Sequence, residues 1–268
     1  NRELPDNRQT ENIMGAIDMS DNVLLLHLND GSEVVDASGN DNVYRSLGED
    51  LESVEGVFGA GSEFDPDKQQ MIRLNQLDGT YGENAKLTMM SWVKLVDNIG
   101  GRVLFNGSYA GWNSLMISAG TASQPTQGYL YYSIGDMYSG TDNPVRTSNT
   151  RYSHDFDLNR WYHVAVTYDS VEGDVKLYLD GEIVKSDKFY GETDDLPDGF
   201  DASKTTRTIK TPINGIKAIG NWSNGVAHNP GSQYSDTFFK GALDEVAVFS
   251  RVLGDDEIKN AYGRAPGK

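Results

Sequence analysis

Two apolar runs with a period of two residues constrain the fold of this chain more than any other feature. Residues 161–168 read WYHVAVTY, and residues 175–179 read VKLYL. A two-residue period places alternate side chains on opposite faces of a β-strand. Asp180 and Gly181 follow the second run, and an Asp-Gly pair tolerates the positive φ angles of a type I′ turn. We therefore predict a strand over 161–168 and a hairpin that joins 175–179 to 182–185.

Similar short runs recur along the chain, with turn residues between them. The pattern predicts further strands over 23–28, 87–95, 102–105, 114–118, 129–134, 216–219 and 243–249. Many short strands with turn signals are typical of a sandwich or barrel rather than of βαβ units. The run over 87–95 is apolar on both faces, as expected of a strand inside a two-layer stack. The sequence thus predicts an all-β protein built as a two-sheet antiparallel β-sandwich.

The 268 residues fit a single β-sandwich domain. Residues 1–20 are mostly polar, and we expect them to form an N-terminal arm or linker ahead of one domain over residues 21–268. The segments 119–128, 136–158 and 187–213 are polar and rich in turn-forming residues. Loops of this length in a compact domain are usually functional or disordered. We therefore predict long loop insertions near 119–158 and 187–213.

The C-terminal part of the sequence predicts a strand followed by a short helix of one to two turns. Asp244 and Glu245 are adjacent at the start of the strand. Strict alternation would point them to opposite faces, so that one could bind something while the other faces solvent or a partner. This geometry does not suit a shared acid–base site.

The predicted helix has a recognisable beginning. If Gly254 is the N-cap, Glu257 falls at the third helical position, where its side chain can accept a hydrogen bond from the N-cap amide. Leu253 and Ile258 then occupy the two positions of a hydrophobic staple. We expect this helix to close the sandwich.

The overall charge restricts the partners. With 23 basic and 40 acidic residues the formal net charge is −17, which argues against nucleic-acid binding because that requires clustered Lys and Arg. The acidity permits cation binding or serves solubility alone. The absence of cysteine excludes disulfides and Cys-based zinc sites. No apolar run is long enough to span a bilayer. The chain begins at Asn1, as a mature or trimmed fragment would.

Five sequence blocks occur in an order that resembles laminin-G-like, concanavalin A-type jelly rolls. They are LLLHLNDGSEVVDASGNDN (24–42), GVFGAGSEFDPDKQQMIRL (56–74), LTMMSWVKL (87–95), RWYHVAVTYD with GDVKLYLDGEIV (160–184), and GALDEVAVF (241–249) with its helix. Gly61 stands where this family usually has Ala. The resemblance implies a jelly-roll sandwich, a fold that hosts lectins, adhesion modules and enzymes alike.

A calcium site is the first candidate for chemistry. Asp36, Asn40, Asn42 and Asp244 offer hard oxygen donors, which calcium prefers. The resemblance implies a structural calcium ion held by Asp36, Asp244 and carbonyls of the 37–42 turn. The alternative is that Asp36 makes only an Asx-type turn and that Asp244 caps a neighbouring backbone segment.

Aromatic residues in or near the predicted loops form the second candidate. A sugar ring can stack on an aromatic face while Asn or Asp side chains bind its hydroxyls, although ordinary loop packing would use the same residues. The predicted ligand-binding residues are Trp112, Tyr138, Trp222, Asn224 and Tyr234, within a wider set that includes Tyr129, Tyr131 and Tyr132.

No catalytic residues are predicted. The E-x-D-x-x-E motif of laminarinase-type enzymes on this fold is absent, and a nucleophilic triad has little support from four His and no Cys. His27 and His163 lie inside apolar strands and are expected to be structural.

Together these features predict a non-catalytic extracellular or cell-surface binding module, stabilised by calcium, whose partner is a glycan or a cell-surface glycoprotein. One alternative is a structural or adhesion domain that contacts other domains of a larger surface protein. A third alternative is a polysaccharide-active enzyme.

Overall fold

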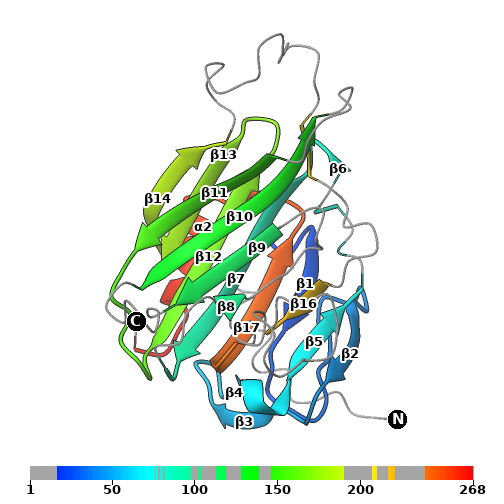
Figure 1. Cartoon of the computed structure of the whole chain (residues 1–268), viewed down its shortest axis with the longest axis vertical. Helices are drawn as coiled ribbons and strands as arrows, with labels where there is room; N and C mark the ends of the chain where they lie inside the picture. Colours follow the sequence, from blue (N-terminus) through cyan, green and yellow to red (C-terminus); the bar gives the residue numbers. More distant parts are fainter. Residues whose placement is uncertain are drawn as a thin grey trace.

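The structure, a computed structural model, describes residues 17–75, 77, 79–80, 82–97, 102–103, 113–118, 128–138, 146–189, 207–209, 217–220 and 239–267. The described strands form three antiparallel sheets of eight, six and three strands, and an α-helix follows the last strand. Figure 1 shows the six-stranded sheet lying in front of the eight-stranded sheet, with the three-stranded sheet beside them. The predicted antiparallel β-sandwich with a C-terminal helix is therefore confirmed.

The eight-stranded sheet contains the strands with the strongest sequence signals. In spatial order its strands are β14 (Glu182–Lys188), β13 (Asp174–Leu179), β12 (Trp161–Asp169), β7 (Lys86–Leu95), β17 (Gly241–Phe249), β4 (Ala60–Phe64) and β3 (Glu52–Glu55), while β1 (Asn22–Leu26) pairs with β17. Asp180 and Gly181 have φ angles of 51° and 80°, which agrees with the predicted turn between β13 and β14.

The two smaller sheets include strands that the sequence did not reveal. The six-stranded sheet runs β6 (Gly82–Glu83), β15 (Arg207–Ile209), β10 (Tyr129–Tyr138), β9 (Asn113–Ser118) and β8 (Arg102–Val103), while β11 (Arg146–Ser153) also pairs with β10. The three-stranded sheet runs β16 (Lys217–Ile219), β5 (Met71–Leu74) and β2 (Val43–Leu47), and the 3-10 helix η1 (Pro66–Lys68) connects β4 to β5.

The prediction of a loop over 136–158 is in part wrong. Strand β10 extends to Tyr138, and β11 pairs with it from Arg146 opposite Asp136 to Ser153 opposite Tyr129. Thr150 in β11 is buried whereas Arg151 beside it is exposed. The strand has a polar sequence because one of its faces is open, so its composition resembles that of a loop. Likewise β14 extends to Lys188 and β15 occupies Arg207–Ile209 within the predicted 187–213 loop, whereas residues 190–206 and 210–213 lie outside the described part.

Two apolar clusters lie on opposite faces of the eight-stranded sheet. The larger cluster fills the space between the sheets and includes Tyr132 of β10 and Tyr168 of β12. The smaller cluster covers the other face of the large sheet and combines Trp92 of β7 with Ile258 of the C-terminal helix α2 (Asp255–Gly263). The large sheet is therefore buried on both faces over much of its area, which explains why β7 is buried along most of its length and has apolar residues on both faces.

Helix α2 begins as the sequence predicts. Its N-cap is Gly254, whose amide donates to a Glu257 carboxylate oxygen at 2.9 Å. Leu253 and Ile258 are both buried, as the staple requires. The helix has nine residues and thus exceeds the predicted one to two turns.

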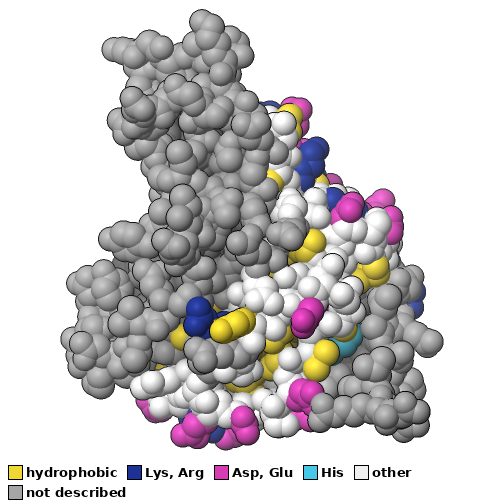
Figure 2. Space-filling view, turned by 90° about the vertical axis from the view of Figure 1, so that its right-hand side faces the viewer, with side chains coloured by type: hydrophobic (Ala, Val, Ile, Leu, Met, Phe, Trp, Pro, Cys, Tyr) yellow, Lys and Arg dark blue, Asp and Glu magenta, His cyan; other side chains and the backbone are white. Residues whose placement is uncertain are grey.

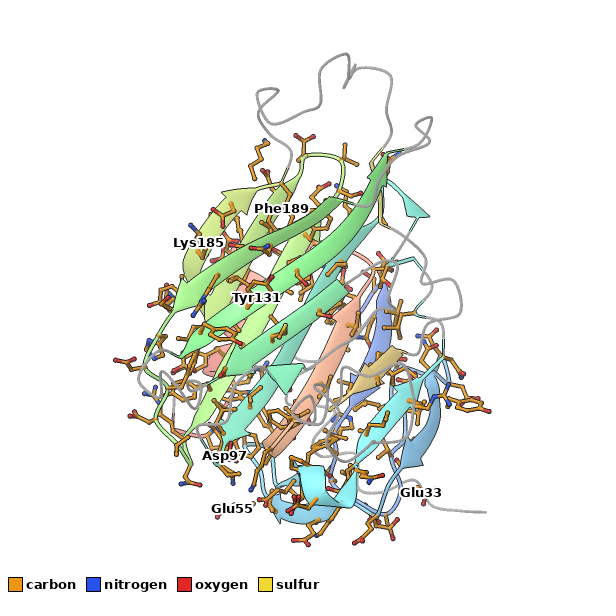
Figure 3. All side chains as sticks on the ribbon, in the orientation of Figure 1. Glu33, Glu55, Asp97, Tyr131, Lys185 and Phe189 are labelled. Atoms are coloured by element: carbon orange, nitrogen blue, oxygen red, sulfur yellow. The ribbon has the colours of Figure 1, made fainter. Side chains whose placement is uncertain are left out.

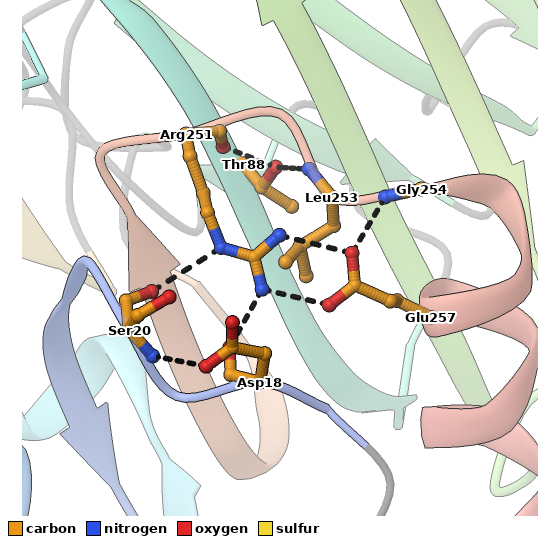
Figure 4. A network of polar contacts seen from close by, with 7 residues as sticks. All are labelled: Asp18, Ser20, Thr88, Arg251, Leu253, Gly254 and Glu257. Carbon is orange, nitrogen blue, oxygen red and sulfur yellow. Dashed lines mark hydrogen bonds and ion pairs between the residues drawn. The ribbon is translucent and has the colours of Figure 1, made fainter.

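Arg251 links the end of β17, the start of α2 and the N-terminal segment (Figure 4). Its guanidinium donates to the Glu257 carboxylate at 2.9 and 2.7 Å and to the carbonyl oxygens of Ser20 at 3.2 Å and Asp18 at 2.6 Å. Residues 17–20 of the predicted arm therefore lie against the domain, with Ile17 in the smaller cluster. Residues 1–16 lie outside the described residues.

Candidate functional site

An extra residue in β17 brings Asp244 and Glu245 into one buried environment. Leu243 and Val246 both belong to the cluster between the sheets, although strict alternation would separate them. The pairing register shifts between Asp244 and Ala247, and Glu245 has a φ angle of 52°. These are the marks of a β-bulge, which places two residues where regular pairing has one. Asp244 and Glu245 are 0% and 2% exposed, so the prediction that one of them could face solvent is wrong.

Each of the two buried carboxyl groups holds a different neighbouring segment. One oxygen of Asp244 accepts hydrogen bonds from the amides of Val57 and Phe58 at 2.7 and 3.0 Å. Glu245 contacts Nδ1 of His27 at 2.7 Å, just beyond the end of β1. The pair thus fastens the turn before β4 and the exit from β1 to the central strand β17.

The environment shifts the protonation equilibria of this cluster. Burial, together with the charge of Glu245, raises the pKa of Asp244 to about 7. Burial also raises the pKa of Glu245, although His27 opposes the shift. Burial alone would lower the pKa of His27, but the hydrogen bond and charge of Glu245 outweigh it, and the net shift is upward. Both carboxyl groups are too buried for a substrate to contact them in this fold.

The second predicted structural histidine, His163, lies in the smaller apolar cluster. Its ring centroid is 5.2 Å from that of Trp92 and 6.3 Å from that of Tyr262 in α2. Burial lowers the pKa of His163 to about 4, so the ring is neutral near pH 7. Both histidines therefore have structural roles, as the sequence predicts: His27 hydrogen-bonds Glu245, and His163 packs against aromatic rings.

The Asp36 carboxylate holds its turn together by accepting hydrogen bonds from backbone amides. One carboxylate oxygen of Asp36 accepts from the amides of Leu25 and Ser38 at 3.0 Å each, and the other accepts from the Asn42 amide at 2.9 Å. The side-chain amides of Asn40 and Asn42 donate to the carbonyl oxygens of Asn22 and Val23. This is the Asx-type arrangement that the sequence left open as an alternative.

Asp36, Asn40 and Asn42 lie together in one turn, but no contact among the described residues joins Asp244 to them. Asp36 fastens β1 to its own turn, whereas Asp244 fastens β17 to residues 57–58. Within the described residues no group of three or more His, Cys, Asp or Glu is placed to hold a metal ion. The oxygens of Asp36 already accept three amides, which leaves them little capacity for an ion. Calcium therefore stays a prediction.

Most of the predicted ligand-binding residues lie outside the described residues. This holds for Trp112, Trp222, Asn224 and Tyr234, and also for the side chain of Tyr138, which ends β10. Of the wider aromatic set, Tyr132 lies in the core between the sheets. Tyr129 and Tyr131, in contrast, are half-buried and alternate with core residues.

Tyr129 and Tyr131 belong to a polar grid on the outward face of the six-stranded sheet. The inward residues of these strands, such as Leu115, Ile117 and Leu130, lie in the core, so their neighbours in sequence point outward. Figure 3 shows Tyr131 on β10 in the front sheet. The outward residues form three cross-strand rows, which are Ser118–Tyr129–Ser153, Met116–Tyr131–Arg151 and Ser114–Ser133–Asn149.

This grid, which we call the β10–β11 face, is open on one side. Its serines on β9 are buried, whereas Asn149, Arg151 and Ser153 on β11 are exposed. The Tyr129 and Tyr131 rings meet edge to face with centroids 6.3 Å apart. The Arg151 guanidinium carbon lies 4.3 Å from the centroid of Tyr129. Burial and the adjacent Tyr129 raise the pKa of Tyr131, so its hydroxyl stays protonated.

Aromatic rings bordered by a hydroxyl, an amide and a guanidinium can bind a sugar. The ring face supplies apolar contact, and the polar groups supply directional hydrogen bonds. Sequence reasoning included the two tyrosines in its aromatic set but missed Asn149 and Arg151. The signal that could have found them is the alternation in RTSNTRYS, where Thr150 and Tyr152 occupy inward positions opposite Tyr132 and Leu130.

The three-stranded sheet also has an exposed tyrosine beside an arginine, but this pair does not belong to the β10–β11 face. Tyr44 on β2 is 59% exposed, and the Arg73 guanidinium carbon lies 5.4 Å from its ring centroid. The side of the molecule with β2 and β5 faces the viewer in Figure 2, where hydrophobic side chains form small groups among acidic and uncharged ones. Tyr44 and Arg73 therefore provide a matched control for the β10–β11 face.

No helix among the described residues is long and apolar enough to cross a membrane.

Solved structures confirm the jelly-roll fold at low sequence identity. The binding domain of Paraclostridial Mosquitocidal Protein 1 matches with a TM-score of 0.65 and 14% identity, over 91% of this chain and 52% of that one. Domain 4 of AbnA, a GH43 extracellular arabinanase from Geobacillus stearothermophilus solved with arabinotriose, matches with a TM-score of 0.55 and 19% identity, over 90% and 98% of the two chains. The Botulinum neurotoxin serotype D binding domain matches with a TM-score of 0.61 and 15% identity, over 94% and 52%.

The sequence comparisons agree with this fold. Pentraxin-related protein PTX3 of Mus musculus is 25% identical over 175 residues, which cover 64% of this chain and 37% of that protein. The chain thus spans well under two thirds of that relative. Residues 67–259 match the Laminin_G_3 family, described as the concanavalin A-like lectin/glucanases superfamily. The chain therefore belongs to the Laminin_G_3 family of the concanavalin A-like lectin/glucanases superfamily.

Proposed function

We propose that this chain is a non-catalytic glycan-binding module that works outside the cell or at its surface. The observation that carries the proposal is the β10–β11 face, where Tyr129 and Tyr131 lie beside the exposed Asn149 and Arg151. The tyrosines are held by strand pairing on a rigid sheet, so they can bind a sugar at little cost in conformational entropy.

The comparisons support a binding role without assigning a ligand. The arabinanase domain, which the match covers almost completely, was solved with arabinotriose. A Botulinum neurotoxin binding domain of the same fold, matched with a TM-score of 0.53, was solved with SialylT.

The proposal is tested by a glycan array followed by calorimetry on the best ligand. A stacked aromatic contact contributes about 0.5–1.5 kcal/mol beyond area burial, so Tyr131→Ala is expected to weaken binding by about 2- to 12-fold. Tyr44→Ala, the matched control, should leave affinity unchanged. Silence across neutral, carboxylated and sulfated glycans would reject the proposal and favour a structural or adhesion domain. Release of reducing ends from any polysaccharide would reject the non-catalytic part.

A further inference from the structure

Arg151 is one of a few described basic residues that lie over an aromatic ring without a described carboxylate partner. Most described Lys and Arg side chains form an ion pair with a carboxylate, namely Lys68, Lys86, Arg160, Lys176, Lys185, Lys188, Lys240, Arg251 and Lys259. Arg151 is exposed, its one described side-chain contact is the Tyr129 ring, and no described carboxylate pairs with it. Arg73 and Lys94 lie over the rings of Tyr44 and Trp161 in the same way, so what distinguishes Arg151 is its place on the β10–β11 face beside Tyr131.

The stacking on Tyr129 leaves the hydrogen-bonding edge of the guanidinium available. A guanidinium is planar and carries five N–H donors in its own plane. When its face lies over an aromatic ring, these donors remain directed outward and can form two parallel bonds to one carboxylate. The ring also limits the motion of the side chain, which lowers the entropy lost when a ligand binds.

The surroundings of Arg151 favour a sugar that carries the carboxylate. Tyr131 is directly opposite Arg151 in the β10–β11 pairing, and Asn149 and Ser153 lie two residues away on the same face. A ring that stacks on Tyr131 would bring a ring substituent toward Arg151, and its hydroxyls toward Asn149 and Ser153. The hydroxyls of a neutral sugar can accept single hydrogen bonds from the guanidinium, whereas a carboxylate can accept two parallel, charge-assisted ones.

We propose that the ligand of the β10–β11 face is a glycan with a carboxylated sugar, whose carboxylate is bound by Arg151 in a two-point contact. This inference rests on the proposed glycan-binding function and specifies its ligand class. The net charge of −17 disfavours a polyanion, because its repeated charges would meet the negative field of the whole protein. A single acidic sugar in an otherwise neutral oligosaccharide avoids this repulsion. The two oxygens of the sugar carboxylate also match the two parallel N–H donors of the Arg151 guanidinium.

The test compares oligosaccharides that end in a sugar acid with the same compounds after reduction of the carboxyl group to an alcohol. Calorimetry is performed on the wild type and on Arg151→Gln, Arg151→Lys and the control Arg73→Gln, with thermal melts to verify folding. We expect the wild type to prefer the acid by about tenfold, consistent with a charge-assisted contact. Arg151→Gln should abolish the preference but retain binding of the neutral compound, Arg151→Lys should restore it in part, and Arg73→Gln should change nothing.

The outcomes separate the two proposals. Equal wild-type affinity for acid and alcohol, or an unchanged preference in Arg151→Gln, would overturn the ligand class while glycan binding sensitive to Tyr131→Ala still stands. Stronger binding of sulfated polymers such as heparin than of the sugar acid would also overturn it. Absence of binding to every glycan would reject the proposed function, and the ligand class with it.

Discussion

Replacement of Asp244 by Asn should flatten the pH dependence of stability between about pH 4 and 7. In the folded protein burial and Glu245 raise the pKa of Asp244 from 3.8 to about 7. In the unfolded chain this group loses its proton near pH 4. Between these values the folded state binds more protons than the unfolded state, so the free energy of unfolding falls as the pH rises.

The size of the effect follows from the shift in pKa. One pKa unit corresponds to 1.36 kcal/mol, so a rise of about three units gives a loss on the order of 4 kcal/mol across this interval. The pKa of His27 is also raised, so the stabilisation from its protonated form is present below pH 6.5 and is lost as the pH rises through its folded value. Glu245, whose pKa burial raises, acts in the same direction. The three groups therefore reinforce one another.

Asn is the informative substitution because its amide resembles the neutral carboxylic acid. Its oxygen can accept from Val57 and Phe58 as Asp244 does, and it carries no charge at any pH. The other oxygen of Asp244 is buried without a described partner, so an amide nitrogen there would cost about 1–3 kcal/mol at every pH. The slope with pH, rather than the absolute stability, is therefore the quantity to compare.

The assay is urea unfolding followed by tryptophan fluorescence at pH values from 4 to 8. Asp255→Asn serves as a control, because hydrogen bonds from Lys176 and Tyr178 lower the pKa of Asp255 and its stabilisation is lost only at acid pH. If Asp244→Asn and the wild type lost stability in parallel between pH 4 and 7, the assignment of a proton to buried Asp244 would be refuted.

Three further predictions concern metal binding and packing. If the predicted calcium site exists, calcium at a hundred times its Kd adds about 2.7 kcal/mol, or roughly 5–10 °C in Tm, and an unchanged melt after complete chelation of a metal-loaded sample would contradict it. Arg251→Ala, which removes the charged contacts to Glu257 and to residues 18 and 20, should cost about 1–3 kcal/mol in urea unfolding, whereas Lys188→Ala at an exposed ion pair should cost less than about 1 kcal/mol. Gly61→Ala should destabilise the folded protein by about 1–3 kcal/mol, because a Cβ there would lie 2.9 Å from the Leu243 carbonyl oxygen and 3.4 Å from the Trp161 ring. An unchanged free energy of unfolding would contradict this and would mean that the sheet relaxes easily at this site.

The sequence predicted those elements whose signal is local. The hairpin at Asp180 and Gly181 follows from turn chemistry, and the start of α2 follows from the spacing of Gly254 and Glu257. Strand β7 was evident from its apolar residues. In these cases nearby residues determine the conformation, so a reading of the sequence alone is sufficient.

Elements that depend on a distant partner were missed or misread. Strand β11 has a polar sequence and exists because it pairs with β10, so it was predicted as loop, and Arg151 on it was overlooked. The bulge in β17 likewise has no local signal, since Glu245 adopts a positive φ angle that a non-glycine residue seldom takes. Both errors affected the interpretation of function, because one concealed a binding residue and the other separated two carboxyl groups that are buried together.

The position of the bulge explains why two acidic residues are tolerated in the interior. Strand β17 pairs with β4 over residues 241–243 and with β1 over residues 246–249, so its neighbour changes at the bulge. At such a change regular ladder pairing is interrupted, and polar groups from both neighbouring segments need partners. Asp244 supplies one for the amides of Val57 and Phe58, and Glu245 supplies one for His27. Asp244 thus substitutes for missing strand pairing, Glu245 adds a side-chain contact to the exit from β1, and the cost of burying the two carboxyl groups is expressed as sensitivity to pH.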